Sequence, residues 1–487
     1  MVKRFQCSLV MTGIVAVASY GQIACDPPED DQGVVPRDLP PPAAPLVDGN
    51  SDPADWPSYG RDLWNTRHNP AEPDHTQVTQ ASVRWKVDLG GDVTATPVVV
   101  GSVVYAGAYN GQFASLDAGS GAPVWSVNLD AEPITASAAV SEGRVLVSTL
   151  AGNVWALDQA TGGTLWTADL TGGNPNVALY TSPIQVDGII YMGVASVEVY
   201  PTGDPISFQG SMAALDAETG DLLWQRYFAS NTQYGAPVWS TPAVMDDMVY
   251  VGTGQAYSKP ATQYSDSMIA LNAGSGVIEW FKQWWANDVF VLLNPDGPDY
   301  DFGASPNLFW IGDRLVVGEG SKSGDYHVVD ALDGTPVWSK RVSNGGFLGG
   351  FLGSTAYANG RIHAATNNLI GYMDPRLPLP PTGGKYVTLS ASSGQVLHSR
   401  LTAPSLSSPC VAGGVVYYTD MLGTIWARNA ATGNVLWSLP TLEPSGSGPS
   451  VSRGVLYVGT GVTSGLGVGV ELPSLAHHLY AIDIDGP

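Results

Sequence analysis

Cysteine is scarce in this chain, which has only Cys7, Cys25 and Cys410 in 487 residues. Cys7 falls in a leader that we expect to be removed, which leaves two cysteines in the mature chain. So small a number excludes a disulfide framework and a metal site built from several cysteines. The sequence also lacks a Cys-x-x-Cys-His segment, so it offers no attachment site for a c-type haem.

Positive charge is scarce as well. Lys and Arg number 21 against 44 Asp and Glu, which gives a formal net charge of −23. A surface with this charge repels phosphate backbones, so we expect no nucleic acid partner. The same charge suits divalent cations, a basic electron-transfer partner or simple solubility, and composition leaves these three open.

The amino terminus has the layout of a secretory signal. Lys3 and Arg4 precede an apolar run, residues 9–18, that is too short to span a bilayer permanently. We therefore expect residues 1–24 to be a signal peptide and the protein to be exported to the periplasm or cell envelope. Residues 22–25, Gln-Ile-Ala-Cys, resemble a bacterial lipobox, so Cys25 is the expected lipidation site and the only expected membrane contact. A plain cleaved signal is the alternative.

Two regions follow the leader. Residues 25–55 are rich in Pro and Asp and cannot bury a core, so we expect a semi-extended tether. Residues 56–487 are the expected folded domain. Across the chain, 58 Gly and 36 Pro indicate many turns and favour short strands over long helices.

A repeat runs through this domain. Six copies have an Asp or Asn, a glycine four residues later and a tryptophan four residues after that, and two further copies are degenerate or incomplete. The turns and their aromatic residues are 116–121 with Trp125, 157–162 with Trp166, 215–220 with Trp224, 271–276 with Trp280, 329–334 with Trp338, 389–394 with His398, and 428–433 with Trp437. An eighth copy at residues 480–483 ends without its tryptophan.

The repeat predicts a β-propeller blade. The Asp or Asn side chain caps a tight turn, Gly supplies the positive φ, and Trp is large enough to cover the seam between blades. Two apolar strands precede each turn, as in residues 96–99 and 103–107, so each unit has about four strands. We expect an all-β fold of eight blades. Seven blades are the alternative, because the copy that ends at His398 is degenerate.

The ends of the chain indicate how the ring closes. Residues 83–87 around Trp85 form a tryptophan strand without a preceding turn, and residues 480–483 form a turn without a tryptophan strand. We expect the two segments to pair and complete the eighth blade, which leaves no open sheet edge.

The Asp-Ala-x-Thr-Gly-x-x-x-Trp repeats resemble those of pyrroloquinoline-quinone (PQQ) enzymes and their non-enzymatic relatives. The lead-in segment, residues 56–67, looks like that of quinoprotein alcohol dehydrogenases. Residues 297–306 are similar to polyvinyl-alcohol dehydrogenase-like members. The resemblance covers about residues 56–487 and implies an eight-bladed propeller with its site near the axis.

The resemblance implies a PQQ site. Trp239 matches the tryptophan that stacks under the quinone, and Lys322 matches the Lys or Arg that contacts a quinone carbonyl. Asp299 and Asp301 fall where relatives carry Trp-Asp-Tyr-Asp, with Pro298 in place of the tryptophan. We expect Asp299 to be the base, with Asp301 as the alternate. A seam tryptophan, a solvated lysine and turn-capping aspartates are the ordinary alternatives.

The resemblance also implies a calcium site. Glu198 matches the glutamate that ligates calcium, and Gln255 occupies the place of an asparagine ligand. Carboxylate and amide oxygens are the ligands that a hard cation prefers. Asp299 or Asp301 would complete this expected metal set, and surface loops are the alternative locations for these residues.

The expected function is therefore a PQQ- and calcium-dependent alcohol dehydrogenase. It would oxidise a small or polymeric alcohol and pass electrons to a separate cytochrome c. The alternative is a non-catalytic propeller lipoprotein that acts as a binding or assembly scaffold. Two departures favour that alternative, namely the lack of a pair of adjacent cysteines and the lack of a capping tryptophan in residues 457–462.

Overall fold

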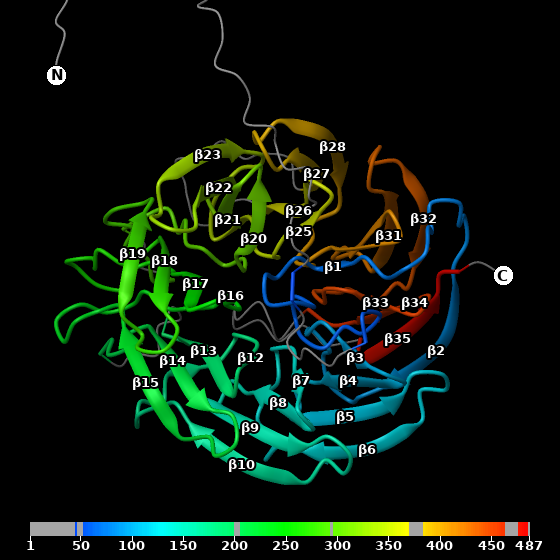
Figure 1. Cartoon of the computed structure of the whole chain (residues 1–487), viewed down its shortest axis with the longest axis horizontal. Coiled ribbons are helices and arrows are strands. Elements are labelled where there is room, and N and C mark those ends of the chain that lie inside the picture. The colour runs from blue at the N-terminus through cyan, green and yellow to red at the C-terminus, as the bar shows by residue number, and fades with distance from the viewer. Residues whose placement is uncertain are drawn as a thin grey trace, which may run out of the picture. The chain divides into compact units, whose positions relative to one another are not determined.

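The computed structural model describes residues 44–45, 52–198, 205–292, 296–369, 383–462 and 476–485. Within these ranges all regular elements are strands, and none forms a helix of the length and apolarity that crossing a membrane requires. The expected signal peptide, Cys25 and nearly all of the tether lie outside the described residues. The strands form eight sheets arranged radially about one axis (Figure 1), which confirms the all-β, eight-bladed propeller.

Each blade has four antiparallel strands, which follow one another along the chain in blades 1 to 7. The strands of blade 1 are β3 (Val98–Val100), β4 (Val103–Gly107), β5 (Gln112–Asp117) and β6 (Pro123–Asn128). Those of blade 2 are β7 (Ala139–Ser141), β8 (Arg144–Ser148), β9 (Asn153–Asp158) and β10 (Thr164–Asp169). Those of blade 3 are β12 (Ile184–Val186), β13 (Ile189–Ser196), β14 (Ser211–Asp216) and β15 (Leu222–Tyr227), with β11 (Val177–Ala178) beside β13. Those of blade 4 are β16 (Ala243–Met245), β17 (Met248–Gly252), β18 (Ser267–Asn272) and β19 (Ile278–Gln283).

The second half of the ring repeats this plan. The strands of blade 5 are β20 (Asn307–Ile311), β21 (Arg314–Gly320), β22 (Asp325–Asp330) and β23 (Pro336–Arg341). Those of blade 6 are β25 (Ala356–Ala358), β26 (Arg361–Leu369), β27 (Gly384–Ser390) and β28 (Val396–Thr402), with β24 (Leu348–Gly350) beside β26. Those of blade 7 are β29 (Cys410–Ala412), β30 (Val415–Thr419), β31 (Thr424–Asn429) and β32 (Val435–Pro440), with β1 (His68–Asn69) beside β29. Those of blade 8 are β33 (Ser450–Ser452), β34 (Val455–Gly459), β35 (His478–Asp483) and β2 (Ser82–Asp88).

The repeat turns connect neighbouring blades. In blade 1 the Asp117 carboxylate accepts the N–H of Ser120 at 2.8 Å, and Gly121 has a φ of +73°. The indole of Trp85, from the preceding blade, packs against Gly121 and donates its Nε1–H to the Ala118 carbonyl at 2.9 Å. Tryptophans 125, 166, 224, 280 and 338 make the same bond to the next blade.

The degenerate copy follows the same geometry. His398 lies 2.6 Å through its Nε2 from the Ala431 carbonyl of blade 7, in the place where the other blades have an indole. Its sheet, β25 to β28, is complete, so the seven-bladed alternative is wrong. Histidine replaces tryptophan here because a ring nitrogen at this position can make the same contact.

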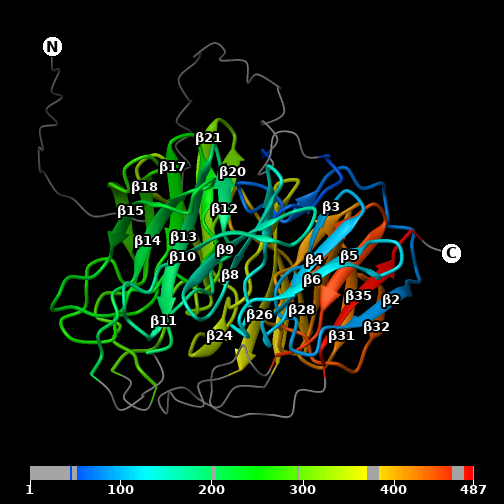
Figure 2. The same cartoon turned by 90° about the horizontal axis from the view of Figure 1, so that it is seen from below.

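The two ends of the propeller pair as expected. Strand β2 runs antiparallel to β35, with Val83 opposite Ile482 and Trp85 opposite Ala481. The last blade is therefore built from both ends of the chain, and the sheet edge that either segment would leave alone is covered. The view at right angles to the first (Figure 2) shows strands running between the two faces of the ring.

The apolar core lies between adjacent sheets. Val104 and Leu116 of blade 1 belong to one buried cluster with Tyr457 and Ile482 of blade 8. Burying both faces of an inner strand in this way accounts for its continuous apolar sequence. The outermost strands face solvent on one side, and β6 alternates accordingly between exposed and half-buried residues.

Candidate functional site

The chain enters every innermost strand through the same short segment. Two residues before the strand stands Ser or Thr in seven blades and Gly in the eighth, followed by Pro in six of the eight. We call these positions the hydroxyl ring: Thr96, Ser137, Ser182, Thr241, Ser305, Ser354, Ser408 and Gly448. A second set, two residues earlier, is called the variable ring: Thr94, Thr135, Tyr180, Trp239, Gly303, Leu352, Leu406 and Gly446.

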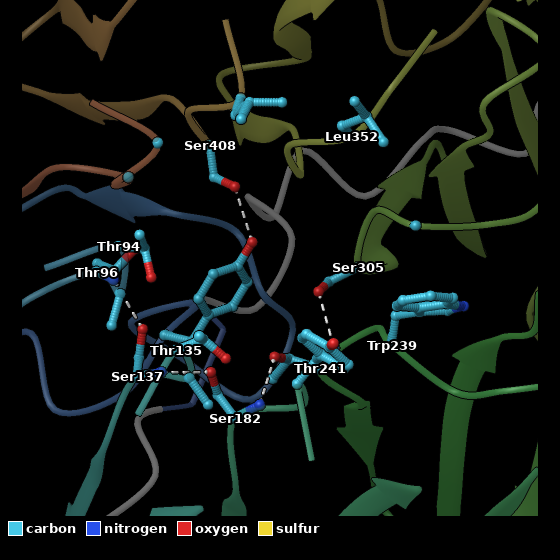
Figure 3. Close-up of a pocket in the computed structure, with 18 of the residues that line it drawn as sticks. Thr94, Thr96, Thr135, Ser137, Ser182, Trp239, Thr241, Ser305, Leu352 and Ser408 are labelled. Atoms are coloured by element: carbon cyan, nitrogen blue, oxygen red, sulfur yellow. Dashed lines mark hydrogen bonds between the residues drawn. The ribbon is translucent and has the colours of Figure 1, made fainter. Parts of the chain in front are cut away.

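The hydroxyl ring is a chain of hydrogen bonds from blade to blade. The backbone N–H of each residue donates to the hydroxyl of the next, as Thr96 does to Ser137 at 3.0 Å. Six such bonds of 2.7–3.3 Å run from Thr96 to Ser408. Figure 3 shows most of these hydroxyls around the pocket. A short side chain with an oxygen atom is needed at each position, which explains the recurrent Ser and Thr.

The lead-in segment closes one end of the axis. Tyr59 donates its hydroxyl to Ser354 at 2.6 Å, and the buried Arg67 donates from Nη2 to the Ser408 and Pro449 carbonyls at 3.0 Å. The Arg67 guanidinium also lies 4.8 Å from the centre of the Tyr59 ring. The segment recognised in the sequence as a lead-in is therefore a plug that is held by blades 6 to 8.

A cavity of about 290 Å³ lies on the axis. All eight residues of the variable ring line it, together with seven of the hydroxyl ring, Tyr59 at one end, and Asp301, Lys322, Phe347, Leu348 and Val462. Of the residues expected from the sequence to form the site, this cavity brings together Trp239, Lys322 and Asp301.

Trp239 is the variable-ring residue of blade 4. Its ring lies 5.4 Å from that of Tyr180 at an interplanar angle of 40°. Its buried Nε1–H finds no hydrogen-bond acceptor within the part of the chain that the structure describes. The indole therefore lines the cavity with its Nε1–H unbonded beside Gly254, unlike the seam tryptophans, whose Nε1–H groups are bonded to backbone.

Lys322 stands on the turn between β21 and β22 and reaches the cavity wall. Its Nζ lies 3.0 Å from Oδ1 of Asp301 and 3.3 Å from Oδ2 of Asp299. It also lies 5.6 Å from the ring centre of Trp239 and 5.5 Å from that of Phe347. Burial alone would lower the pKa of Lys322, but the two aspartates raise it above its ordinary value, so the side chain is an ammonium.

The two aspartates occupy different places. Both are fully buried, but only Asp301 lines the cavity, and Asp299 has a φ of +59°. Burial raises the pKa of Asp299 well above its usual range against the opposing effect of Lys322, and the neighbouring Asp301 and Asp288 add to the rise. Lys322 thus contacts both aspartates, of which Asp301 is the one at the cavity.

Asp288 holds this segment in place. Its carboxylate accepts the backbone N–H of Tyr300 at 2.8 Å and that of Asp299 at 3.3 Å. Burial raises the pKa of Asp288 to about 6.

Glu198 and Gln255 are buried but do not line the cavity. The Glu198 carboxylate accepts hydrogen bonds from Asn176 Nδ2 at 2.8 Å, Ser207 Oγ at 2.9 Å and the Phe208 N–H at 2.8 Å. Gln255 donates weakly to the Phe290 carbonyl at 3.5 Å, and its Oε1 has no partner among the described residues. No group of three or more His, Cys, Asp or Glu in the described ranges is placed to hold a metal ion.

The hydroxyl ring and the residues around Trp239 were not expected from the sequence. The signal for the ring was present, because a Ser-Pro or Thr-Pro pair precedes most innermost strands. For Tyr59, Tyr180 and Phe347 the sequence carried no signal beyond their being aromatic.

Comparisons with known proteins agree with this architecture. A family model described as outer membrane protein assembly factor BamB matches residues 59–288, 207–346 and 322–474. The polyvinylalcohol dehydrogenase of Sphingopyxis sp. (strain 113P3) is 26% identical over 463 residues, covering 80% of this chain and 69% of that protein. The quinohemoprotein alcohol dehydrogenase ADH-IIG of Pseudomonas putida is 23% identical over 391 residues, covering 69% of this chain and 51% of that protein.

The solved structures give the same fold. The quinohemoprotein alcohol dehydrogenase from Comamonas testosteroni superposes with a TM-score of 0.75 at 19% identity, covering 89% of this chain and 81% of that one. Since the family model matches well over half of the residues, the chain belongs to the PQQ_2 family of β-propeller repeat proteins.

Proposed function

We propose that this protein is a PQQ-dependent alcohol dehydrogenase. The observation that carries the proposal is the placement of Trp239, Lys322 and Asp301 on the wall of one axial cavity. The relatives named polyvinylalcohol dehydrogenase and quinohemoprotein alcohol dehydrogenase support the same reaction class.

The side chains that line the cavity match the groups that the cofactor requires. PQQ is a flat ortho-quinone with three carboxylates, so it needs an aromatic platform, a cation and several hydrogen-bond donors. Trp239 supplies the platform and Lys322 the cation. The buried Oγ1 atoms of Thr94 and Thr135 have no partners within the described chain, so these hydroxyls are available to ligand carboxylates. A volume of about 290 Å³ is near the lower limit for small-molecule sites.

PQQ, when bound, supplies the two-electron acceptor for the oxidation. Asp301 faces the cavity as a carboxylate and accepts the hydroxyl proton of the alcohol. Lys322 keeps a positive charge beside that carboxylate and beside the ring of Trp239, where it stabilises negative charge on a bound ligand. Phe347 and Leu348 form an apolar part of the wall, and the Phe347 ring lies 5.5 Å from the Lys322 Nζ.

Calcium does not enter the proposal. The resemblance implies a ligand set of Glu198, Gln255 and an aspartate, but of these residues only Asp301 lines the cavity. Glu198 is occupied by its own hydrogen bonds, and Gln255 does not reach the cavity wall. The residues present therefore do not fit the implied ion, and no step uses it.

The electron acceptor and the location complete the proposal. We propose that a separate cytochrome c takes the electrons, which is in keeping with the net charge of −23 and the lack of a haem attachment motif. We also propose export and a lipid anchor at Cys25, on the grounds of the signal-like leader and the lipobox-like segment.

A second candidate function is a binding or assembly scaffold. The observation that favours it is the description of the matching family model, which names an outer membrane assembly factor. Such a protein would keep the blades and have no use for the Trp239, Lys322 and Asp301 arrangement.

Reconstitution distinguishes the two. The purified protein is incubated with PQQ, and dye-linked oxidation of a secondary alcohol is measured. For the enzyme, Asp301→Asn lowers kcat by about 100-fold or more, because it removes the base. Asp313→Asn, a change of the same kind at an exposed turn, leaves kcat unaltered. A protein that neither binds PQQ nor oxidises any alcohol would instead be a scaffold.

A further inference from the structure

We infer that the positive charge of this pocket is the Lys322 ammonium, and that the pocket binds its quinone without a divalent metal ion. The inference rests on the proposed function, because it concerns how the same cavity holds PQQ.

The first support is the position of Lys322 between the two carboxyl groups that a metal would need. Its Nζ is 3.0 Å from Asp301 and 3.3 Å from Asp299, and only 7% of the residue is exposed. A cation that coordinated either aspartate would have to displace the ammonium or lie against a like charge in a buried site. The ammonium already neutralises the carboxylate that faces the cavity.

The second support is the state of Glu198. Its two carboxylate oxygens accept bonds from Asn176 Nδ2, from the N–H and Oγ of Ser207, and from the Phe208 N–H, all at 2.8–3.1 Å. Turning the carboxylate toward a metal would leave two backbone N–H groups without an acceptor, and such buried groups are costly to leave unpaired. Glu198 is therefore bound to Ser207 and Phe208 and is not available as a metal ligand.

The third support comes from the buried oxygen atoms that are left as possible metal ligands once the contacts of Lys322 and Glu198 are taken into account. The buried Oε1 atom of Gln255 has no hydrogen-bond partner in the described chain, and neither do Oδ1 of Asp299 and the two carboxylate oxygens of Asp301. Of these, Oδ1 of Asp301 lies 3.0 Å from the Lys322 Nζ. Calcium takes six to eight oxygen ligands, with carboxylates among them. With Glu198 occupied, the Gln255 amide oxygen and two aspartates that already contact the Lys322 ammonium fall short of that set.

The negative groups of the ligand have other partners in the cavity. The hydroxyls of Thr94 and Thr135 line it and are unpartnered within the described ranges. Ser137 and Ser182 accept backbone N–H groups through Oγ, which leaves their own hydroxyl protons available to donate. Hydroxyl donors and one ammonium together can hold carboxylates without a metal ion.

The test compares PQQ binding by the unmodified full-length protein in two media. Metals are removed with EDTA and their absence is checked by elemental mass spectrometry. PQQ is then titrated in EDTA and in millimolar Ca²⁺, with quenching of tryptophan fluorescence as the readout. We expect the same Kd in both media to within about twofold.

Variants at Lys322 test the source of the charge. Lys322→Met should weaken PQQ binding by about tenfold or more in both media, whereas Lys322→Arg keeps the charge and should retain most of the affinity. Lys340→Met removes the same charge from the exposed outer strand β23 and should leave Kd unaltered. The comparison of media uses the unmodified protein, so it stands even where Lys322→Met fails to fold.

Each outcome decides a different point. Binding that is tenfold or more tighter with Ca²⁺, or a stoichiometric calcium ion that survives dialysis, overturns this inference and leaves the proposed function standing. An unaltered Kd in Lys322→Met also overturns it. Failure to bind PQQ in either medium overturns the proposed function, and this inference with it.

Discussion

The guanidinium of Arg67 occupies the space that a side chain at Gly448 would fill. A Cβ placed on Gly448 would lie 2.7 Å from Nη2 of Arg67 and 2.7 Å from Oγ1 of Thr96. Gly448 is the one member of the hydroxyl ring without a hydroxyl, and Arg67 donates to Thr96 Oγ1 at 3.3 Å across this gap. The plug is therefore fastened at the point where the ring of side chains is interrupted.

Replacing Gly448 tests this fastening. Gly448→Ala should lower the free energy of unfolding by about 1–3 kcal/mol, because the added methyl overpacks the site and displaces the guanidinium. Urea unfolding monitored by tryptophan fluorescence measures the change. Gly446→Ala is the matched control, since its Cβ would meet nothing closer than 3.6 Å. Equal free energies of unfolding for the two variants would show that the binding of Arg67 does not require the free space beside Gly448.

Gly254 allows Trp239 and Asp301 to approach each other. A Cβ on Gly254 would lie 2.6 Å from Nε1 of Trp239 and 3.2 Å from Oδ2 of Asp301. Gly254→Ala should therefore tilt the platform and raise the Kd for PQQ by about tenfold, measured by fluorescence quenching. Gly274→Ala on an exposed turn, where the nearest atom is 3.7 Å away, should not alter binding. Unchanged affinity in Gly254→Ala would mean that the indole has room to move.

The two aspartates should differ in their effect on the reaction. Asp301 lines the cavity and Asp299 does not, and burial raises the pKa of Asp299 well above its usual range. Asp299→Asn should lower kcat by less than about tenfold, against the loss of about 100-fold or more in Asp301→Asn. Circular dichroism and thermal unfolding of both variants check that they fold. The reverse order of effects would make Asp299 the base, as the sequence suggested.

Glu319 should make stability depend on pH. It is buried on β21, neither oxygen has a hydrogen-bond partner within the described chain, and burial raises its pKa well above the usual range. The native state therefore keeps this proton at pH values where the unfolded chain has released it. The contribution of the protonated Glu319 to the free energy of unfolding is complete below the pKa of this residue in the unfolded chain. It is lost as the pH rises toward the pKa of Glu319 in the folded protein.

Replacing Glu319 with glutamine removes this pH dependence of stability, because glutamine is uncharged in both the folded and the unfolded state. The Tm of the unmodified protein relative to that of Glu319→Gln should fall as pH rises from about 5 to about 8. Differential scanning calorimetry measures both values. Glu279→Gln on the exposed side of β19 is the control for charge alone. A difference in Tm that stays constant over this range would show that Glu319 is ionised in the native state.

The sequence by itself determined the blades. Six of the turns have a capping Asp or Asn, a Gly with positive φ and a Trp within about ten residues, so local chemistry specifies the unit. The segment at Trp85 is a tryptophan strand without its turn, and the segment at Ile482 is a turn without its tryptophan strand. Together they make one unit, which determined how the ring closes. Trp239 and Lys322 could be proposed as site residues because their local segments match a known pattern.

Only the tertiary structure decided which groups face the axis. Ser and Thr residues of seven blades are far apart along the chain, and they become neighbours only when the ring is closed. The left-handed backbone of Asp299, held by Asp288, turns Asp301 to the cavity. Glu198 is occupied by Ser207 and Phe208, and no local pattern reveals that contact. Short-range periodicity specifies elements, whereas the direction of a side chain at the axis depends on what packs beside it.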